Sequence, residues 1–368
     1  MKLFGHFIFI SFGVLCILAH ADTCVPVKYH SKVEEASTDN RIEMEVKTAW
    51  KENDFSKLDK LAAEYSSGQA RTVSGNWKLG VFDTAVKNQL NIEWPSLWYV
   101  ATLDSKKCKC SIPLAEKYDE ADLRWEAIHK KILSWIQKYP DSKYAQICLA
   151  HYQSNRGWFY RGSGVSDEVP NHAWPKFREF INQSHQTLDS ISWQGAPDPV
   201  WFSSMANIAI SEQYSKEQLN SLLQRLYNEG SSYPDAYQII SLRFLPKWGG
   251  SYEELEKFAR EAMKHAKDDE GAMLYARIYW SVDREIDGSI FMKTKANYPL
   301  VKKGFDDLLK KYPSYKNLNG KASFSCEVLD HPALQKTMKL LGNHVDRDSL
   351  KMGFDYCMRF LAEEPVYQ

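Results

Sequence analysis

Three copies of one local phrase constrain most strongly what this chain can fold into. Each copy joins two amphipathic stretches through a Tyr-Pro pair and a small or acidic residue: Tyr139-Pro140-Asp141, Tyr233-Pro234-Asp235 and Tyr312-Pro313-Ser314. Proline ends the first helix because it lacks an N–H donor and moves the preceding residue out of the α region. The short polar residue beside it can cap the next helix. The repetition predicts stacked helical hairpins, an architecture that more often presents surfaces than carries out chemistry.

The stretches around these phrases carry apolar residues at three- and four-residue spacing, the pattern of helices with one buried face. Capping residues are expected at Asp54, at Ser215 with Gln218 and at Ser251 with Glu254. The clearest stripes are Phe55, Leu58, Leu61, Ala62 and Tyr65; Trp125, Ile128, Ile132, Trp135 and Tyr139; Leu219, Leu222, Leu223 and Leu226; Leu255, Phe258, Ala259 and Ala262; and Leu300, Gly304, Phe305, Leu308, Leu309 and Tyr312. Only residues 98–103 suggest a strand, and an extended loop explains them equally well.

These patterns predict an all-α fold. The Tyr-Pro phrases are unevenly spaced and fit no multiple of the tetratricopeptide period, so we expect a degenerate tetratricopeptide-like α-solenoid, an array of antiparallel helix pairs. Turns are expected at residues 66–75, 162–170, 195–199, 249–250 and 287–289, where glycine, proline and small polar residues gather.

The first 21 residues have the form of a signal peptide. Lys2 is followed by an apolar run from Phe7 to Leu18, and Ala19-His20-Ala21 has the small-x-small form of a cleavage site. No later stretch approaches the roughly 20 apolar residues of a membrane span. We expect cleavage after Ala21 and a periplasmic or secreted protein, with an uncleaved N-terminal anchor as the alternative. The expected divisions are an extension at 22–40, a helical-repeat domain at 41–330 with a Cys-containing insertion loop near 94–113, and a C-terminal helical cap at 331–368.

Six cysteines remain after cleavage: Cys24, Cys108, Cys110, Cys148, Cys326 and Cys357. An even number in an exported chain favours disulfides, although free buried thiols and a metal site at Cys108-Lys-Cys110 stay open. Adjacent pairing within Cys108-Lys-Cys110 is sterically difficult. Cys326 and Cys357 lie on consecutive predicted helices and are the first candidates for a pair.

Charge and motifs exclude several function classes. Lysine plus arginine and aspartate plus glutamate both number 47, so no net field attracts nucleic acid. The chain has no zinc-protease motif, nucleophile elbow, phosphate loop or Cys-x-x-Cys pair. We therefore predict no catalytic residue, metal or cofactor from the sequence, and the balance leans away from an enzyme.

One segment combines chemistry typical of binding sites. Residues 155–164 join two arginines and three adjacent aromatic residues to glycines at the end of a helix. Arginine binds carboxylates, and aromatic faces stack on sugars, peptide groups or cations. The candidate ligand-binding residues are Arg156, Trp158, Tyr160 and Arg161. In the alternative, the aromatic rings pack under the next hairpin and the arginines hold carbonyl groups at the helix end.

Several phrases together resemble a known family: Ala70 to Leu79 (ARTVSGNWKL), Leu245 to Ser251 (LPKWGGS) with Phe258-Ala259-Arg260, Leu274 to Trp280 (LYARIYW), and Gly304 to Leu308 (GFDDL). The chain resembles a bacterial domain-of-unknown-function family, numbered four thousand and thirty-four, whose members are taken as tetratricopeptide-like helical proteins. The resemblance runs from about residue 40 to 330. It implies a helical fold and a bacterial source, and it carries over no catalytic residue.

The architecture favours a scaffold that binds a protein or peptide, since helical arrays present side chains from successive helices along one surface. One alternative is a cell-envelope hydrolase, which requires a deep pocket where a histidine meets a carboxylate. The other is a glycan-binding module that exposes the flat ring of Trp158.

Overall fold

The computed structural model describes residues 27–67, 70–92, 114–162, 166–229, 233–267 and 270–362. In the range 114–162, side chains are described from residue 120 onward. These ranges are mainly helical, and they contain no β-strand. The predicted all-α class is therefore confirmed. The signal peptide, Cys24, the possible strand at 98–103 and the insertion loop with Cys108 and Cys110 lie outside the described residues.

The first three helices form a unit at the N-terminal end of the described chain: α1 (Lys32–Glu52), α2 (Phe55–Ser67) and α3 (Lys78–Gln89). A capping box between Ser31 and Glu34 starts α1, so the helix already includes most of the second half of the expected 22–40 extension. Asn53, in the left-handed conformation, ends α1, and the Asp54 carboxylate accepts the Lys57 N–H at the start of α2.

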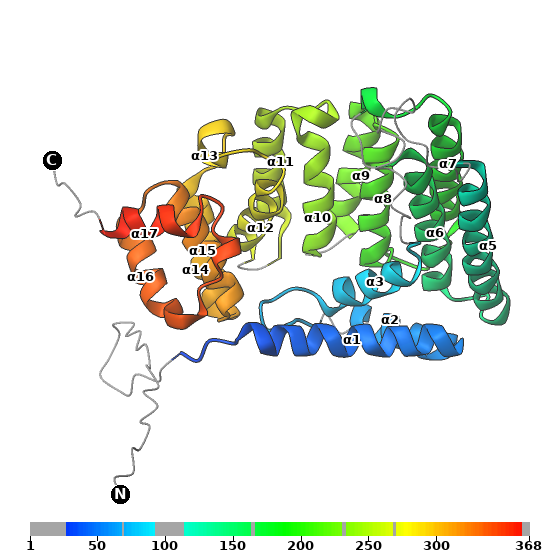
Figure 1. The fold of residues 1–368 in the computed structure, drawn as a ribbon, viewed down its shortest axis with the longest axis horizontal. Helices are drawn as coiled ribbons and strands as arrows, with labels where there is room; N and C mark the ends of the chain where they lie inside the picture. The colour runs from blue at the N-terminus through cyan, green and yellow to red at the C-terminus, as the bar shows by residue number, and fades with distance from the viewer. Residues whose placement is uncertain are drawn as a thin grey trace, which may run out of the picture.

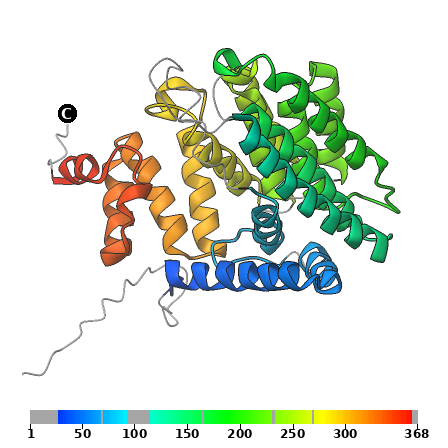
Figure 2. The same cartoon turned by 45° about the vertical axis from the view of Figure 1, so that its right-hand side comes forward.

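From α5 to α15 the described helices form an array, in which all but the short α13 stand side by side (Figure 1). They are α5 (Leu114–Lys138), α6 (Lys143–Arg161), α7 (Ala173–Ser190), α8 (Pro199–Ser211), α9 (Lys216–Glu229), α10 (Pro234–Ser241), α11 (Tyr252–His265), α12 (Gly271–Asp283), α13 (Ile290–Lys293), α14 (Tyr298–Lys311) and α15 (Tyr315–Glu327). Both views show α1 running across one end of the array, roughly at right angles to its helices (Figures 1 and 2). Adjacent helices pack in a solenoid-like manner.

Each Tyr-Pro phrase joins two helices, as predicted. Ser142 caps α6 by accepting the Ala145 N–H, and Ser314 caps α15 by accepting the Asn317 N–H. At the second phrase Pro234 is itself the first residue of α10, which fits its fixed φ and missing N–H.

The predicted apolar stripes form one continuous core that extends from α1 to α15. Trp125, Trp135 and Phe305 are each at most 1% exposed, so these bulky stripe residues are fully inside. Their packing supplies most of the stability of a helical array, because the propensities of single helices are small.

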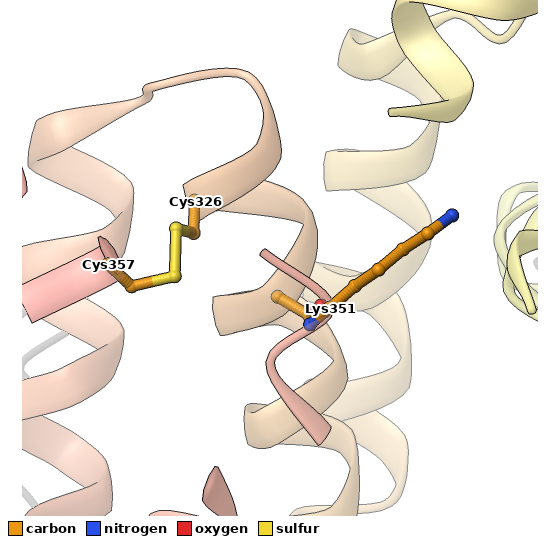
Figure 3. Close-up of a disulfide and its surroundings, with 4 residues drawn as sticks. Cys326, Lys351 and Cys357 are labelled. Atoms are coloured by element: carbon orange, nitrogen blue, oxygen red, sulfur yellow. Dashed lines mark hydrogen bonds between the residues drawn. A yellow bond between two sulfur atoms is a disulfide. The ribbon is translucent and has the colours of Figure 1, made fainter. Parts of the chain in front are cut away.

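A smaller apolar cluster holds the C-terminal cap, formed by α16 (His331–Leu341) and α17 (Phe354–Ala362), against α15. The predicted Cys326–Cys357 disulfide is confirmed, with an S–S distance of 2.04 Å. Lys351 lies nearby and extends away from the disulfide (Figure 3). Its ammonium reaches the Asp283 carboxylate at 2.6 Å and lies 3.9 Å from Glu327. Cys148 is a buried free thiol.

Candidate functional site

A recess with apolar and charged side chains lies between α9 and α11 of the array. The two helices themselves are labelled in Figure 1. The two helices run parallel. Near their N-termini Lys216 forms an ion pair with Glu254 at 3.0 Å, and near their C-termini the rings of Tyr227 and His265 stack with centroids 4.4 Å apart. These two contacts bound a groove of about 630 Å³, which we call the α9–α11 groove. Its size falls within the range of ligand pockets, about 300–1,000 Å³.

Helical spacing explains which side chains line the α9–α11 groove. On α9, Leu219, Leu223 and Tyr227 follow one another at intervals of four residues and therefore share a face. The facing side of α11 presents Phe258 with charged neighbours. The full lining is Tyr214, Lys216, Leu219, Asn220, Leu223, Gln224, Tyr227, Arg243, Phe244, Gly249, Gly250, Glu254, Lys257, Phe258, Glu261 and His265.

The connection between α10 and α11 sets the floor of the groove. Two short 3₁₀ turns, Leu242–Phe244 and Pro246–Trp248, lead into the Gly249–Gly250 pair. Gly249 has a φ of +80°, and a Cβ on Gly250 would lie 2.4 Å from the Phe244 carbonyl oxygen, so this turn requires both glycines. Arg243 donates to the Tyr214 carbonyl at 2.9 Å, which ties the floor to the turn before α9.

The chemistry of the groove is that of a recognition surface. Leu219, Leu223 and Phe258 belong to the core and form the base of the groove, each at most 8% exposed, and the rim carries both positive and negative side chains. Burial raises the pKa of the Tyr227 hydroxyl, with smaller contributions from Tyr237 and Glu261, so this phenol stays neutral. An apolar floor with charges of both signs at its edge suits an amphipathic segment.

The four candidate ligand-binding residues lie together at the junction of α5, α6 and α7. The Arg156 guanidinium donates to Asp122 at 3.0 Å and to Glu126 at 2.8 Å, and it lies over the Phe180 ring at 4.7 Å. Tyr160 donates to the same Asp122 carboxylate and stacks on the same Phe180 ring. These contacts join α6 to its two neighbours.

The other two candidates pack against α7. The Trp158 ring meets the Phe177 ring edge-on at 5.1 Å, and the Arg161 guanidinium lies 5.0 Å from the Trp158 ring centre. Arg161 also donates to the Gly162 carbonyl at 3.0 Å, at the end of α6. Trp158, Tyr160 and Arg161 lie as the packing alternative expects, whereas Arg156 binds the Asp122 and Glu126 carboxylates instead of a helix-end carbonyl. None of the four lines the α9–α11 groove. A ligand at these residues stays a prediction.

A buried polar cluster that no sequence pattern indicated lies between α3 and α6. Asp83 accepts a hydrogen bond from the Tyr144 hydroxyl at 2.8 Å, lies 2.9 Å from Nε2 of His151, and pairs with Lys87 at 2.6 Å. Burial alone would raise the pKa of Asp83, but the charges of Lys87 and His151 hold it well below its usual value. Burial is also the main reason that the pKa of His151 is lowered.

This cluster does not meet the requirement for a catalytic site. Asp83 is 4% and His151 is 5% exposed, so a substrate cannot reach either group in this conformation. A second histidine, His185 on α7, lies 2.9 Å from Glu212, and this hydrogen bond is the main cause of its raised pKa. Glu212 borders an open cleft of about 600 Å³ whose lining does not include His185. Both histidine pairs join neighbouring helices.

Within the described chain, no group of three or more His, Cys, Asp or Glu residues is placed to hold a metal ion. The helices of these same ranges also include none that is long and apolar enough to cross a bilayer. Comparison with protein-family models, with curated proteins and with solved structures finds no match for the chain. The resemblance to the bacterial family of unknown function therefore stays a prediction.

Proposed function

We propose that the protein is an exported scaffold whose α9–α11 groove binds an amphipathic helical segment of a partner protein. The groove itself carries this proposal. It lies between two parallel helices that are joined at both ends by side-chain contacts and leave an apolar recess between them. The Cys326–Cys357 disulfide and the signal-like residues 1–21 support a location outside the cytoplasm.

A helix is the occupant that the groove favours. Its α9 wall has apolar residues four apart, its α11 wall adds Phe258, and a ligand helix with apolar residues at similar spacing can interdigitate with them. The two ends of the groove differ, which favours one orientation of a bound helix. Lys216 and Glu254 lie at one end, and the Tyr227–His265 stack lies at the other. Burial of apolar ligand surface contributes roughly 25 cal/mol per Å², from which the cost of ordering the ligand must be subtracted.

The test is selection of helical peptides from a display library against the mature protein, followed by fluorescence anisotropy with the selected peptides. Gln224 is exposed and lines the groove, so Gln224→Trp should fill the recess without disturbing the core. Asn228 is exposed on the same helix outside the lining, and Asn228→Trp is the matched control.

We expect Gln224→Trp to weaken binding at least about tenfold, which corresponds to about 1.4 kcal/mol, while Asn228→Trp leaves the affinity unchanged. Two results would overturn the proposal. One is a library that yields no peptide tighter than about 100 μM. The other is a set of selected peptides that bind both variants equally well.

A further inference from the structure

A second cavity, separate from the α9–α11 groove, opens beside the first of the three Tyr-Pro phrases. It measures about 720 Å³ and lies between α2, the turn from α5 to α6, and the loop from α7 to α8. We call it the α2–α6 cavity. Two hydrogen bonds join its three walls. The Ser142 hydroxyl donates to Asp59 of α2 at 2.5 Å. The Ser66 hydroxyl of α2 donates to Asp198, in the loop before α8, at 2.5 Å.

The face of α2 that lines the α2–α6 cavity explains why space remains there. Helical spacing puts four residues on this face: Asp59, Ala62, Ala63 and Ser66. The two alanines are small, so they leave a gap between the polar residues at the two ends of the face. Asp59 and Ser66 are two helical turns apart, about 10 Å along the axis. The gap is therefore long enough for a ligand built from small rings.

Two carboxylates of the lining, Asp59 and Asp198, have only neutral donors among the described residues. Besides the serine hydroxyl, Asp59 accepts the Trp135 indole N–H at 3.3 Å. Besides the serine hydroxyl, Asp198 accepts the Val200 N–H at 2.8 Å. Burial raises the pKa of both carboxyl groups, as expected where no cation compensates for lost water. Each carboxylate oxygen has a second lone pair, so both groups can accept further hydrogen bonds from a ligand.

The turn from α5 to α6 adds two positive groups to the lining. Lys138 and Lys143 lie on either side of Tyr139-Pro140-Asp141, and neither forms an ion pair with a described residue. With the exposed Asp141 included, the lining has three carboxylates and two ammonium groups, so its charges nearly cancel. An ion of either sign would meet like charges as well as opposite ones. The charge distribution therefore favours an uncharged ligand that both donates and accepts hydrogen bonds.

One aromatic ring of the lining is available for stacking on a ligand. Trp193, in the loop from α7 to α8, is partly buried, and no ring or cation of the described chain stacks on it. Trp158, the tryptophan of the sequence-predicted ligand site, differs because Phe177 and Arg161 contact its ring. A flat indole beside hydrogen-bonding charged groups suits a sugar ring, because its C–H face is apolar and each of its hydroxyls both donates and accepts.

We propose that the α2–α6 cavity binds an uncharged saccharide, with one sugar ring on the Trp193 indole and hydroxyl groups that donate to Asp59 and Asp198. Lys143 donates to a sugar oxygen from the wall formed by the first Tyr-Pro phrase. Hydrogen bonds to charged groups are roughly twice as strong as neutral ones, so a few of them can orient a weakly bound sugar. This site does not depend on the α9–α11 groove, and either proposal can fail alone.

Saturation-transfer difference NMR on the mature protein tests this assignment with maltose, cellobiose, lactose and N,N′-diacetylchitobiose. Sorbitol is the ligand control, because it carries hydroxyl groups but no ring. Trp193→Ala removes the stacking surface. Trp248→Ala is the matched control, because this tryptophan is also partly buried, has no described stacking partner and lies outside the lining. Asp198→Asn removes a charged acceptor and keeps a favourable capping residue for α8. Circular dichroism of each variant verifies that the fold is retained.

We expect at least one disaccharide to bind with a Kd of about 5 mM or lower, at least about a tenfold loss in Trp193→Ala and a smaller loss in Asp198→Asn. Trp248→Ala and Gln224→Trp, which fills the α9–α11 groove, should leave the affinity unchanged. Should Trp193→Ala fail to fold, Asp198→Asn and Lys143→Met decide the question. The proposal is wrong if none of the four disaccharides binds at about 20 mM, if sorbitol binds equally well, or if Trp248→Ala weakens binding as much as Trp193→Ala.

Discussion

Removal of the Cys326–Cys357 disulfide should loosen the C-terminal cap by an amount that follows from the structure. The two cysteines are 31 residues apart, and the chain-entropy relation for a loop of this length gives about 3.7 kcal/mol at 25 °C. Both side chains are 0% exposed, so Cys326→Ala/Cys357→Ala preserves apolar character and adds no buried polar group. The change therefore acts mainly through the lost cross-link.

The effect should be local, because the cap has its own apolar cluster. Leu334, Leu341 and Leu350 pack in that cluster around the two cysteines, apart from the main core. Lys351 still pairs with Asp283 in the double variant and should keep part of the cap docked. We expect α17 to open more often while α5 to α12 stay as stable as in the parent protein.

Hydrogen exchange measured by mass spectrometry is the assay. A loss of about 3.7 kcal/mol corresponds to a fall in protection of up to roughly 500-fold in the peptides that cover α17. Cys148→Ala is the control, since this buried free thiol lies on α6 and should alter exchange there and not in α17. Unchanged exchange in α17 of the double variant would refute the reasoning, and so would an equal rise in exchange along the whole chain.

Two further predictions concern stability. Burial, followed by the charge of Asp283, raises the pKa of Glu327 to about 8 from its ordinary value of 4.5. The folded state therefore holds this proton more tightly than the unfolded state does, and the free energy of unfolding should fall as the pH rises from 4.5 to about 8. Glu327→Gln should flatten this part of the profile in urea unfolding followed by circular dichroism, and an unchanged slope would contradict the assignment. Gly304→Ala should destabilise the protein by about 1–3 kcal/mol in thermal unfolding, because the new Cβ would lie 2.1 Å from the Ala272 carbonyl oxygen. Gly195→Ala, where nothing lies within 4 Å, should change stability by less than about 0.5 kcal/mol, and equal effects at the two positions would show that the contact is not responsible.

Features that depend on neighbouring residues could be predicted from the sequence. The spacing of Leu219, Leu222, Leu223 and Leu226 places them on a common helix face. Both hydrogen bonds of the predicted capping box are present: the Ser215 N–H donates to the Gln218 side chain, and the Gln218 N–H donates to the Ser215 hydroxyl. The Cys326–Cys357 pair was predicted correctly from its place near the end of the chain, but the two residues lie on α15 and α17 with α16 between them, and not on consecutive helices as expected. Such inferences need only helix geometry and short connections.

Features that depend on distant segments could not be predicted in the same way. The start of α1 was missed because its first buried residue is Glu35, which breaks the apolar pattern expected of a buried helical face. Thr72 and Ser74 satisfy this carboxylate with hydrogen bonds of 2.9 and 2.6 Å from their hydroxyls, and both come from a loop beyond α2. The Asp83–His151 pair spans 68 residues, and neither residue belongs to a motif. Long-range polar pairs of this kind leave no local periodicity.

The buried polar contacts explain how the N-terminal helices keep one position across the array. Apolar packing alone tolerates small shifts of one helix over another, whereas a buried carboxylate is costly unless its particular donors are in place. Glu35 requires Thr72 and Ser74 of the loop before α3, and the Ser74 carbonyl in turn accepts a hydrogen bond from Arg277 of α12 at 3.0 Å. Asp83 requires Tyr144 and His151 of α6. A shift of α1 or α3 would leave these carboxylates unpaired at several kcal/mol each. Polar pairing therefore specifies the positions of α1 and α3 on the array more narrowly than apolar packing alone would.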